Sequence, residues 1–124
     1  MQLILDSHVL LWWVTNDPKL RANARSDIAT AETVAVSAAT VWELEIKRAA
    51  GRLQAPADLE RQISRHRFTP LNVTFAHARA AANLPRHHAD PFDRMLVAQA
   101  QLEGLTIVTR DPHIPPYGVA VLLA

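Results

Sequence analysis

The chain has 124 residues, of which 49% are hydrophobic, and its formal net charge is +1. This predicts one globular domain over residues 1–124, while the near-neutral charge gives no sign of a strongly basic nucleic-acid binder. The absence of cysteine excludes a disulfide framework and a thiolate metal site. Because no secretory signal or bilayer-length apolar run is visible, we expect a soluble cytoplasmic protein without a membrane role.

Short apolar segments alternate with helical patterns along the first half of the chain. Asp17-Pro18 breaks the first helical pattern, and Ser37 and Gly51 are typical first and last residues of a helix. We expect, in order, a strand at 3–5, helices at 7–14 and 20–30, a strand at 34–36, and helices at 37–50 and 56–67.

The second half continues the alternation. Asp90-Pro91 is a strong helix start, with Asp as the N-cap and Pro in the first helical position, and Gly104 ends that helix. Alternating strands and helices favour an α/β fold with a central parallel sheet of four to five strands flanked by helices. The expected elements are an extended segment or short strand at 71–73, helices at 75–83 and 91–103, a strand at 106–109 and an edge strand at 119–122.

Two aspartates follow predicted strands. Asp6 ends the strand at 3–5, and Asp111 comes just after the strand at 106–109. Ligands of open α/β sheets bind at the carboxyl ends of the strands, so both acids are candidates for one site. Each also has a local explanation, because Asp6 can cap the next helix and Asp111 can begin a turn.

Two further acids lie on predicted helices. Glu43 has Lys47 four residues later, so it is either a site acid or half of a surface pair, a role that also suits Glu45. Asp93 lies in the first turn of its helix, where an acid complements the helix dipole, but it shares a side with apolar residues. We therefore place it at the mouth of the core and interpret Asp90 as the helix cap.

Taken together, these four acids predict a cation site. Clustered carboxylates repel one another, and their arrangement makes sense if Mg²⁺ or Mn²⁺ lies among them, since these ions prefer oxygen ligands. Such a site can lower the pKa of a bound water and stabilise charge on a phosphodiester. The set consists of Asp6, Glu43, Asp93 and Asp111.

The acids belong to four stretches that together resemble the PIN-domain family, and within it the VapC-type toxins of bacterial toxin–antitoxin pairs. The resemblance covers nearly the whole chain. Ser7 stands where many members have threonine, which keeps the hydroxyl, and Ile114 stands where an aromatic residue is common. The stretches are LILDSHVLLW at 3–12, VSAATVWE at 36–43, DPFDRMLVAQA at 90–100 and VTRD at 108–111.

The resemblance implies an Mg²⁺- or Mn²⁺-dependent endoribonuclease that cleaves RNA, often tRNA or other structured RNA. It assigns the metal to the four acids and a supporting hydroxyl to Thr109, with Ser7 as a further candidate. It also implies a homodimer restrained by an antitoxin protein, whose C-terminal segment lies along the toxin and can push a basic residue into the acidic pocket.

Basic residues surround these stretches. Arg94 and Arg110 adjoin site acids, and each could neutralise a phosphate or pair with an acid. Residues 61–67 and 86–88 form two basic patches that could contact RNA phosphates, although for the first we favour an ordinary solvated face. We disfavour a transition-metal site at His87-His88, because adjacent histidines seldom point to one ion.

Three tryptophans raise the question of a docking surface. Trp12 and Trp13 are adjacent on one helix and cannot both face one core, so one is either an interface residue or a cover for a neighbouring loop. Trp42 is expected in the core.

Two other function classes remain open at this stage. An aspartate-based phosphohydrolase would use Asp6 as its nucleophile, but such enzymes normally carry a second aspartate where this chain has His8. A non-catalytic binding module would use the acids only as caps and surface pairs. A serine nucleophile has no support, because Ser7-His8 is not framed as a nucleophile elbow.

Overall fold

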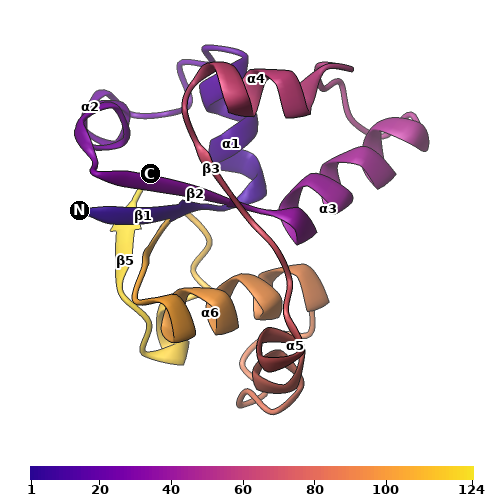
Figure 1. Cartoon of the computed structure of the whole chain (residues 1–124), viewed down its shortest axis with the longest axis vertical. Helices are drawn as coiled ribbons and strands as arrows, with labels where there is room; N and C mark the ends of the chain where they lie inside the picture. Colours follow the sequence, from indigo (N-terminus) through magenta and orange to yellow (C-terminus); the bar gives the residue numbers. More distant parts are fainter.

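A computed structural model describes all 124 residues and contains a five-stranded sheet between two layers of helices (Figure 1). The strand order is β3-β2-β1-β4-β5, and every neighbouring pair is parallel, as predicted. The strands are β1 (Gln2–Leu5), β2 (Thr33–Ser37), β3 (Thr69–Leu71), β4 (Thr106–Thr109) and β5 (Val121–Leu123).

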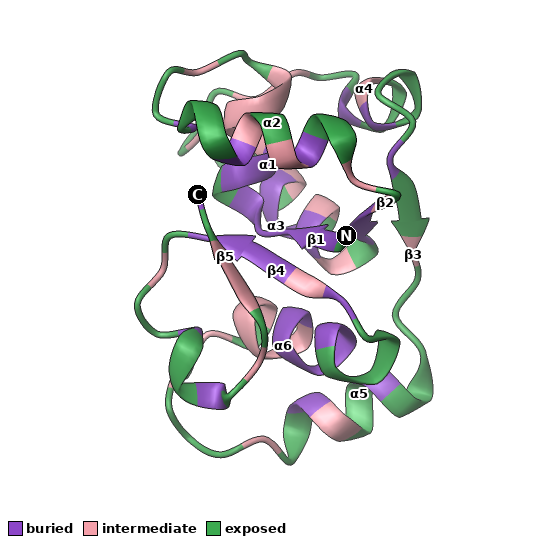
Figure 2. Ribbon diagram, turned by 90° about the vertical axis from the view of Figure 1, so that its left-hand side faces the viewer, coloured by how far each residue is buried: buried purple, intermediate pink, exposed green.

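Helices cover both faces of the sheet. Figures 1 and 2 both show α1, α2 and α4 on one side and α5 and α6 on the other. Helix α3 contacts both α1 and α6, so it joins the two layers at one end of the sheet. The helices are α1 (Ser7–Val14), α2 (Ala22–Thr30), α3 (Ala38–Ala49), α4 (Leu59–Arg65), α5 (Phe75–Ala82), α6 (Pro91–Glu103) and a short 3₁₀ turn, η1 (Pro115–Tyr117).

The side-chain alternation of β1 explains why the sheet has two apolar cores. Successive side chains of a strand point to opposite faces. Leu3 and Leu5 belong to the core under α1 and α2, whereas Ile4 belongs to the core shared with α6. All three are fully buried, as the purple central strands in Figure 2 show. The continuous apolar sequence of β1 thus follows from its position in the middle of a covered sheet.

The predicted boundaries differ from the structure mainly between residues 56 and 73. The helix expected from residue 56 begins at Leu59, the first of its residues to be buried, and ends before Arg67, whose φ of 60° is left-handed. Buried Phe68 then leads directly into β3, which therefore starts two residues before the expected segment at 71–73.

The tryptophan prediction is wrong for Trp42, whose exposed fraction is 64%. The buried residues of α3 are Thr40, Glu43 and Leu44, and Trp42 points away from that side. Trp12 and Trp13 are both half-buried and pack against the core, so each covers neighbouring structure.

Two further observations concern Ile114 and the lengths of the helices. Ile114, which stands where the sequence resemblance leads us to expect an aromatic residue, is 1% exposed and belongs to the core shared with α6. None of the helices combines the length and apolar composition that crossing a bilayer requires.

Candidate metal centre

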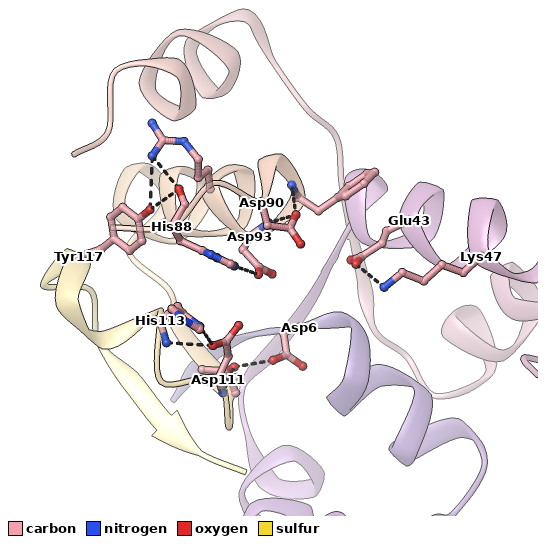
Figure 3. A network of polar contacts seen from close by, with 12 residues as sticks. Asp6, Glu43, Lys47, His88, Asp90, Asp93, Asp111, His113 and Tyr117 are labelled. Atoms are coloured by element: carbon pink, nitrogen blue, oxygen red, sulfur yellow. Dashed lines mark hydrogen bonds and ion pairs between the residues drawn. The ribbon is translucent and has the colours of Figure 1, made fainter. Parts of the chain in front are cut away.

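Five acids, Asp90 and the four predicted site acids, line one pocket of about 390 Å³ whose walls contain no hydrophobic side chain. Figure 3 shows them facing a common space at the carboxyl edge of the sheet. Asp6 follows β1 and Asp111 follows β4, while Glu43 comes from α3 and Asp93 from the first turn of α6. The structure therefore brings together side chains that are up to 105 residues apart in the sequence.

Asp6 is both a helix cap and a pocket acid. Its Oδ1 atom accepts a hydrogen bond of 2.8 Å from the backbone N–H of Val9, which caps α1. Its Oδ2 atom accepts one from the hydroxyl of Thr109. Asp6 is only 7% exposed, yet no Lys, Arg or His forms an ion pair with it. Burial raises the pKa of its carboxyl, since desolvation outweighs both hydrogen bonds.

Thr109 is the last residue of β4 and is 1% exposed. While it donates to Asp6, its Oγ1 atom accepts a 3.0 Å hydrogen bond from the backbone N–H of Asp111. One hydroxyl therefore fixes both strand-end acids relative to each other. Ser7, the first residue of α1, is also buried and lines the pocket.

Glu43 combines the two roles that the sequence left open. It is 7% exposed in the pocket wall, and its Oε2 atom lies 2.9 Å from the Nζ atom of Lys47, which lines the same pocket. Glu45 faces elsewhere and pairs with Arg48 at 2.8 Å. These two glutamates of one helix therefore provide a matched comparison of a pocket acid and a surface acid.

Asp93 lies between Asp90, which caps the helix, and the ring of His88. The Oδ1 atom of Asp90 accepts from the backbone N–H groups of Phe92 at 2.8 Å and Asp93 at 3.4 Å, so Asp90 is the helix cap. The Oδ2 atom of Asp93 lies 2.8 Å from the Nε2 atom of His88. Burial, with the nearby charge of Asp90, raises the pKa of Asp93 to about 6 despite the hydrogen bond from His88.

Asp111 has the opposite pKa shift. Burial alone would raise it, but the backbone N–H and ring Nδ1 of His113 both lie 2.9 Å from its Oδ1 atom. These hydrogen bonds stabilise the charged carboxylate and lower the pKa of Asp111.

His88 and His113 also line the pocket, although the sequence predicted no site role for His113 and raised His88 only together with His87. Their rings stack at 4.6 Å between centroids and 12° between planes. Ligand atoms within 4.8 Å of one another form two groups, His88 with Asp111 and His113, and His88 with Asp90 and Asp93. No sequence spacing indicates this contact, because it depends on how two loops fold; only the position of His113 two residues after Asp111 is a hint.

Stacked histidines do not form a ready transition-metal site. The lone pairs of two nearly parallel rings lie in parallel planes, so they do not converge on one ion. Asp6 and Glu43 belong to neither tight group, so the four acids surround the pocket without meeting at one point.

This donor set fits a hard divalent cation that keeps part of its water shell. Mg²⁺ prefers oxygen ligands and usually retains several waters, which a polar pocket of about 390 Å³ accommodates. Asp6 is moreover a buried acid without an ion-pair partner, so a cation in the pocket would offset the cost of ionising it.

The two arginines next to site acids point away from the pocket. Arg94 donates to backbone carbonyls and to the hydroxyl of Tyr117. Arg110 donates to the carbonyls of Lys19 and Ala124, and its guanidinium lies 4.6 Å from the ring centroid of Trp12. Neither arginine forms an ion pair with an acid.

Comparison with known proteins agrees with this architecture. The PIN domain profile matches residues 3–118. Ribonuclease VapC22 of Mycobacterium tuberculosis is 32% identical over 116 residues, which cover 90% of this chain and 88% of that protein. A VapBC2 structure from Rickettsia felis, bound to a promoter DNA fragment, matches with a TM-score of 0.70 and 15% identity over 98% of both chains. FitAcB from Neisseria gonorrhoeae matches with a TM-score of 0.68 and 20% identity, over 98% of this chain and 97% of that one.

Proposed function

Because the chain belongs to the PIN-domain family and is related to a VapC ribonuclease, we propose that it is the endoribonuclease toxin of a toxin–antitoxin pair. Residues 1–124 act as one domain that hydrolyses RNA phosphodiesters with Mg²⁺ or Mn²⁺. The observation that carries this proposal is the pocket in which four carboxylates from separate elements face one another.

Asp6, Glu43, Asp93 and Asp111 are the residues that would hold the cation. When bound, a divalent cation lowers the pKa of water and stabilises negative charge on a phosphodiester. The chain itself supplies the fixed anionic cage. Thr109 holds Asp6 and Asp111 in register, and His88 orients Asp93.

The raised pKa values of two of these acids support such a cage. Asp93 and Asp6 are both harder to ionise than an ordinary aspartate, because burial disfavours their charged forms. A cation offsets that cost, so metal binding and ionisation of the two aspartates are coupled.

The partners follow from the family. We propose that the chain forms a homodimer and pairs with a cognate antitoxin protein; a toxin–antitoxin complex from Klebsiella pneumoniae with the same fold supports the antitoxin partner. The proposed substrate is tRNA or another structured RNA.

The direct test is RNA cleavage by purified protein with Mg²⁺ or Mn²⁺. Wild type is expected to cleave, Glu43→Gln to lose most activity, and Glu45→Gln to match wild type, because only Glu43 faces the pocket. Expression without the antitoxin should arrest bacterial growth, and Glu43→Gln should relieve the arrest. Equal harmlessness of wild type and Glu43→Gln would contradict the toxin role.

A further inference from the structure

A second pocket, of about 520 Å³, borders the acidic one and has the opposite character. Its lining contains no carboxylate. His88 and His113 line both pockets, so their stacked rings form the wall between them. The polar side chains of this basic pocket are Arg86, His87, His88, Arg94 and His113.

Arg94 builds this pocket and is not free to bind a ligand. Its Nη1 atom donates to the carbonyls of Pro85 at 2.9 Å and His88 at 3.4 Å, and to the hydroxyl of Tyr117 at 3.3 Å. Its Nη2 atom donates to the carbonyls of Ala81 at 3.0 Å and Leu84 at 2.9 Å. One guanidinium thereby fixes the loop between α5 and α6.

Arg86, in contrast, is a free cation held on that fixed loop. It is exposed and has neither an ion pair nor a side-chain hydrogen bond within the protein. The ring of the next residue, His87, packs edge-on against Tyr117 at 4.9 Å and 85°. The pocket therefore presents an unpaired guanidinium, the group best suited to bidentate phosphate binding, on an ordered backbone.

We propose that this basic pocket binds a backbone phosphate of the RNA next to the phosphate that reacts, with Arg86 as its main contact. The inference rests on the proposed nuclease function. Apart from the cation that it would hold, the acidic pocket offers RNA only carboxylates, so further contacts to the RNA backbone come from beside it, and the basic pocket shares a wall with it. The His88–His113 wall then separates the phosphate that is held from the phosphate that is cleaved.

Binding of a fluorescently labelled single-stranded RNA to the Asp6→Asn protein, measured by anisotropy over a range of salt concentrations, tests the proposal without cleavage. Adding Arg86→Ala should weaken binding several-fold and reduce the slope of log K against log salt by about 0.7, the value for one lost phosphate contact on a single strand. Arg86→Lys should retain most of the slope because it keeps the charge.

Arg61→Ala is the matched control, since Arg61 is an exposed arginine of α4, on the opposite side of the sheet from α5 (Figure 1). It should leave affinity and slope unchanged. An unchanged slope in Arg86→Ala would overturn the proposal. The proposal would also be overturned if the pocket bound free phosphate and not RNA. In that case Arg86→Ala would abolish thermal stabilisation by inorganic phosphate and leave RNA binding unaltered.

Different results would contradict the proposed nuclease function and the proposed phosphate pocket. If wild type does not cleave RNA with any divalent metal, the proposed function fails. If wild type cleaves RNA but Arg86→Ala has the same KM and salt dependence, only the phosphate pocket fails.

Discussion

The hydroxyl of Thr109 donates a hydrogen bond to the Oδ2 atom of Asp6 across the neighbouring strands β4 and β1. The same hydroxyl accepts from the backbone N–H of Asp111. A residue that is 1% exposed thus determines where two of the four pocket acids lie. Because the hydroxyl has a donor and an acceptor role at once, no other side chain of similar size except serine can replace it.

Thr109→Val is therefore expected to lower the free energy of unfolding by about 1–3 kcal/mol, because it leaves two buried polar groups without a partner. It should also lower the RNA cleavage rate, since Asp6 and Asp111 lose their common support. Urea unfolding and cleavage assays measure the two effects. Thr109→Ser, which keeps the hydroxyl, should retain most of both properties; equal losses in the serine and valine variants would contradict this role.

The raised pKa of Asp93 makes the stability of the metal-free protein depend on pH. The pKa is about 6 in the folded state and near 3.8 in the unfolded chain, so the folded state binds the proton more tightly. The free energy of unfolding should therefore fall as the pH rises from about 4 to about 6. Asp93→Asn removes this dependence and should be more stable than wild type at pH 7 but not at pH 3.5.

Thermal unfolding of both proteins in EDTA, from pH 3.5 to 8, measures this difference. The two proteins differ only at residue 93, so the comparison reports on this carboxyl together with its contact to His88. A difference between the two melting temperatures that stays constant over this range would show that Asp93 ionises normally.

Arg94 should be a structural residue of the α5–α6 loop. Arg94→Lys is expected to lose roughly 2–4 kcal/mol of unfolding free energy, because an ammonium group cannot reach the five acceptors that the guanidinium contacts. Hydrogen exchange of residues 84–88 should increase at the same time. Arg79→Ala, an exposed arginine of α5, serves as the control and should change neither quantity.

The exposure of the tryptophans predicts a clear order of stability effects. Trp42→Ala should change the free energy of unfolding of the monomer by no more than about 0.5 kcal/mol, because the side chain is 64% exposed. Trp13→Ala should cost about 2–3 kcal/mol, since its ring packs on Phe68 at 5.7 Å and on the core. Chemical denaturation at low protein concentration measures both, and the reverse order would contradict the packing described.

The sequence predicted the structure best where a residue acts on its neighbours in the chain. Asp90-Pro91 and Gly104 mark the ends of α6 because caps act through their own neighbours, and the alternation of strands and helices determines a parallel sheet. The predicted boundaries of α4 and β3 differ from the structure, because burial of Leu59 and Phe68 depends on tertiary packing that no local pattern records.

At the site, two acids each have both of the roles that the sequence offered as alternatives. Asp6 caps α1 with one oxygen and lines the pocket with the other, and Glu43 pairs with Lys47 inside the pocket wall. The stacked pair of His88 and His113 could not be predicted, because the two residues are on separate loops and share no periodicity.

The central claim is that acids from four elements form a single cation site, and calorimetric titration of Mn²⁺ tests it most directly. Wild type and Glu45→Gln should bind the ion with equal affinity. Each pocket variant should lose about tenfold or more in affinity. Unchanged Mn²⁺ affinity in Glu43→Gln and Asp93→Asn would contradict the claim, because the acids would then share a pocket without sharing an ion. The four pocket variants are Asp6→Asn, Glu43→Gln, Asp93→Asn and Asp111→Asn.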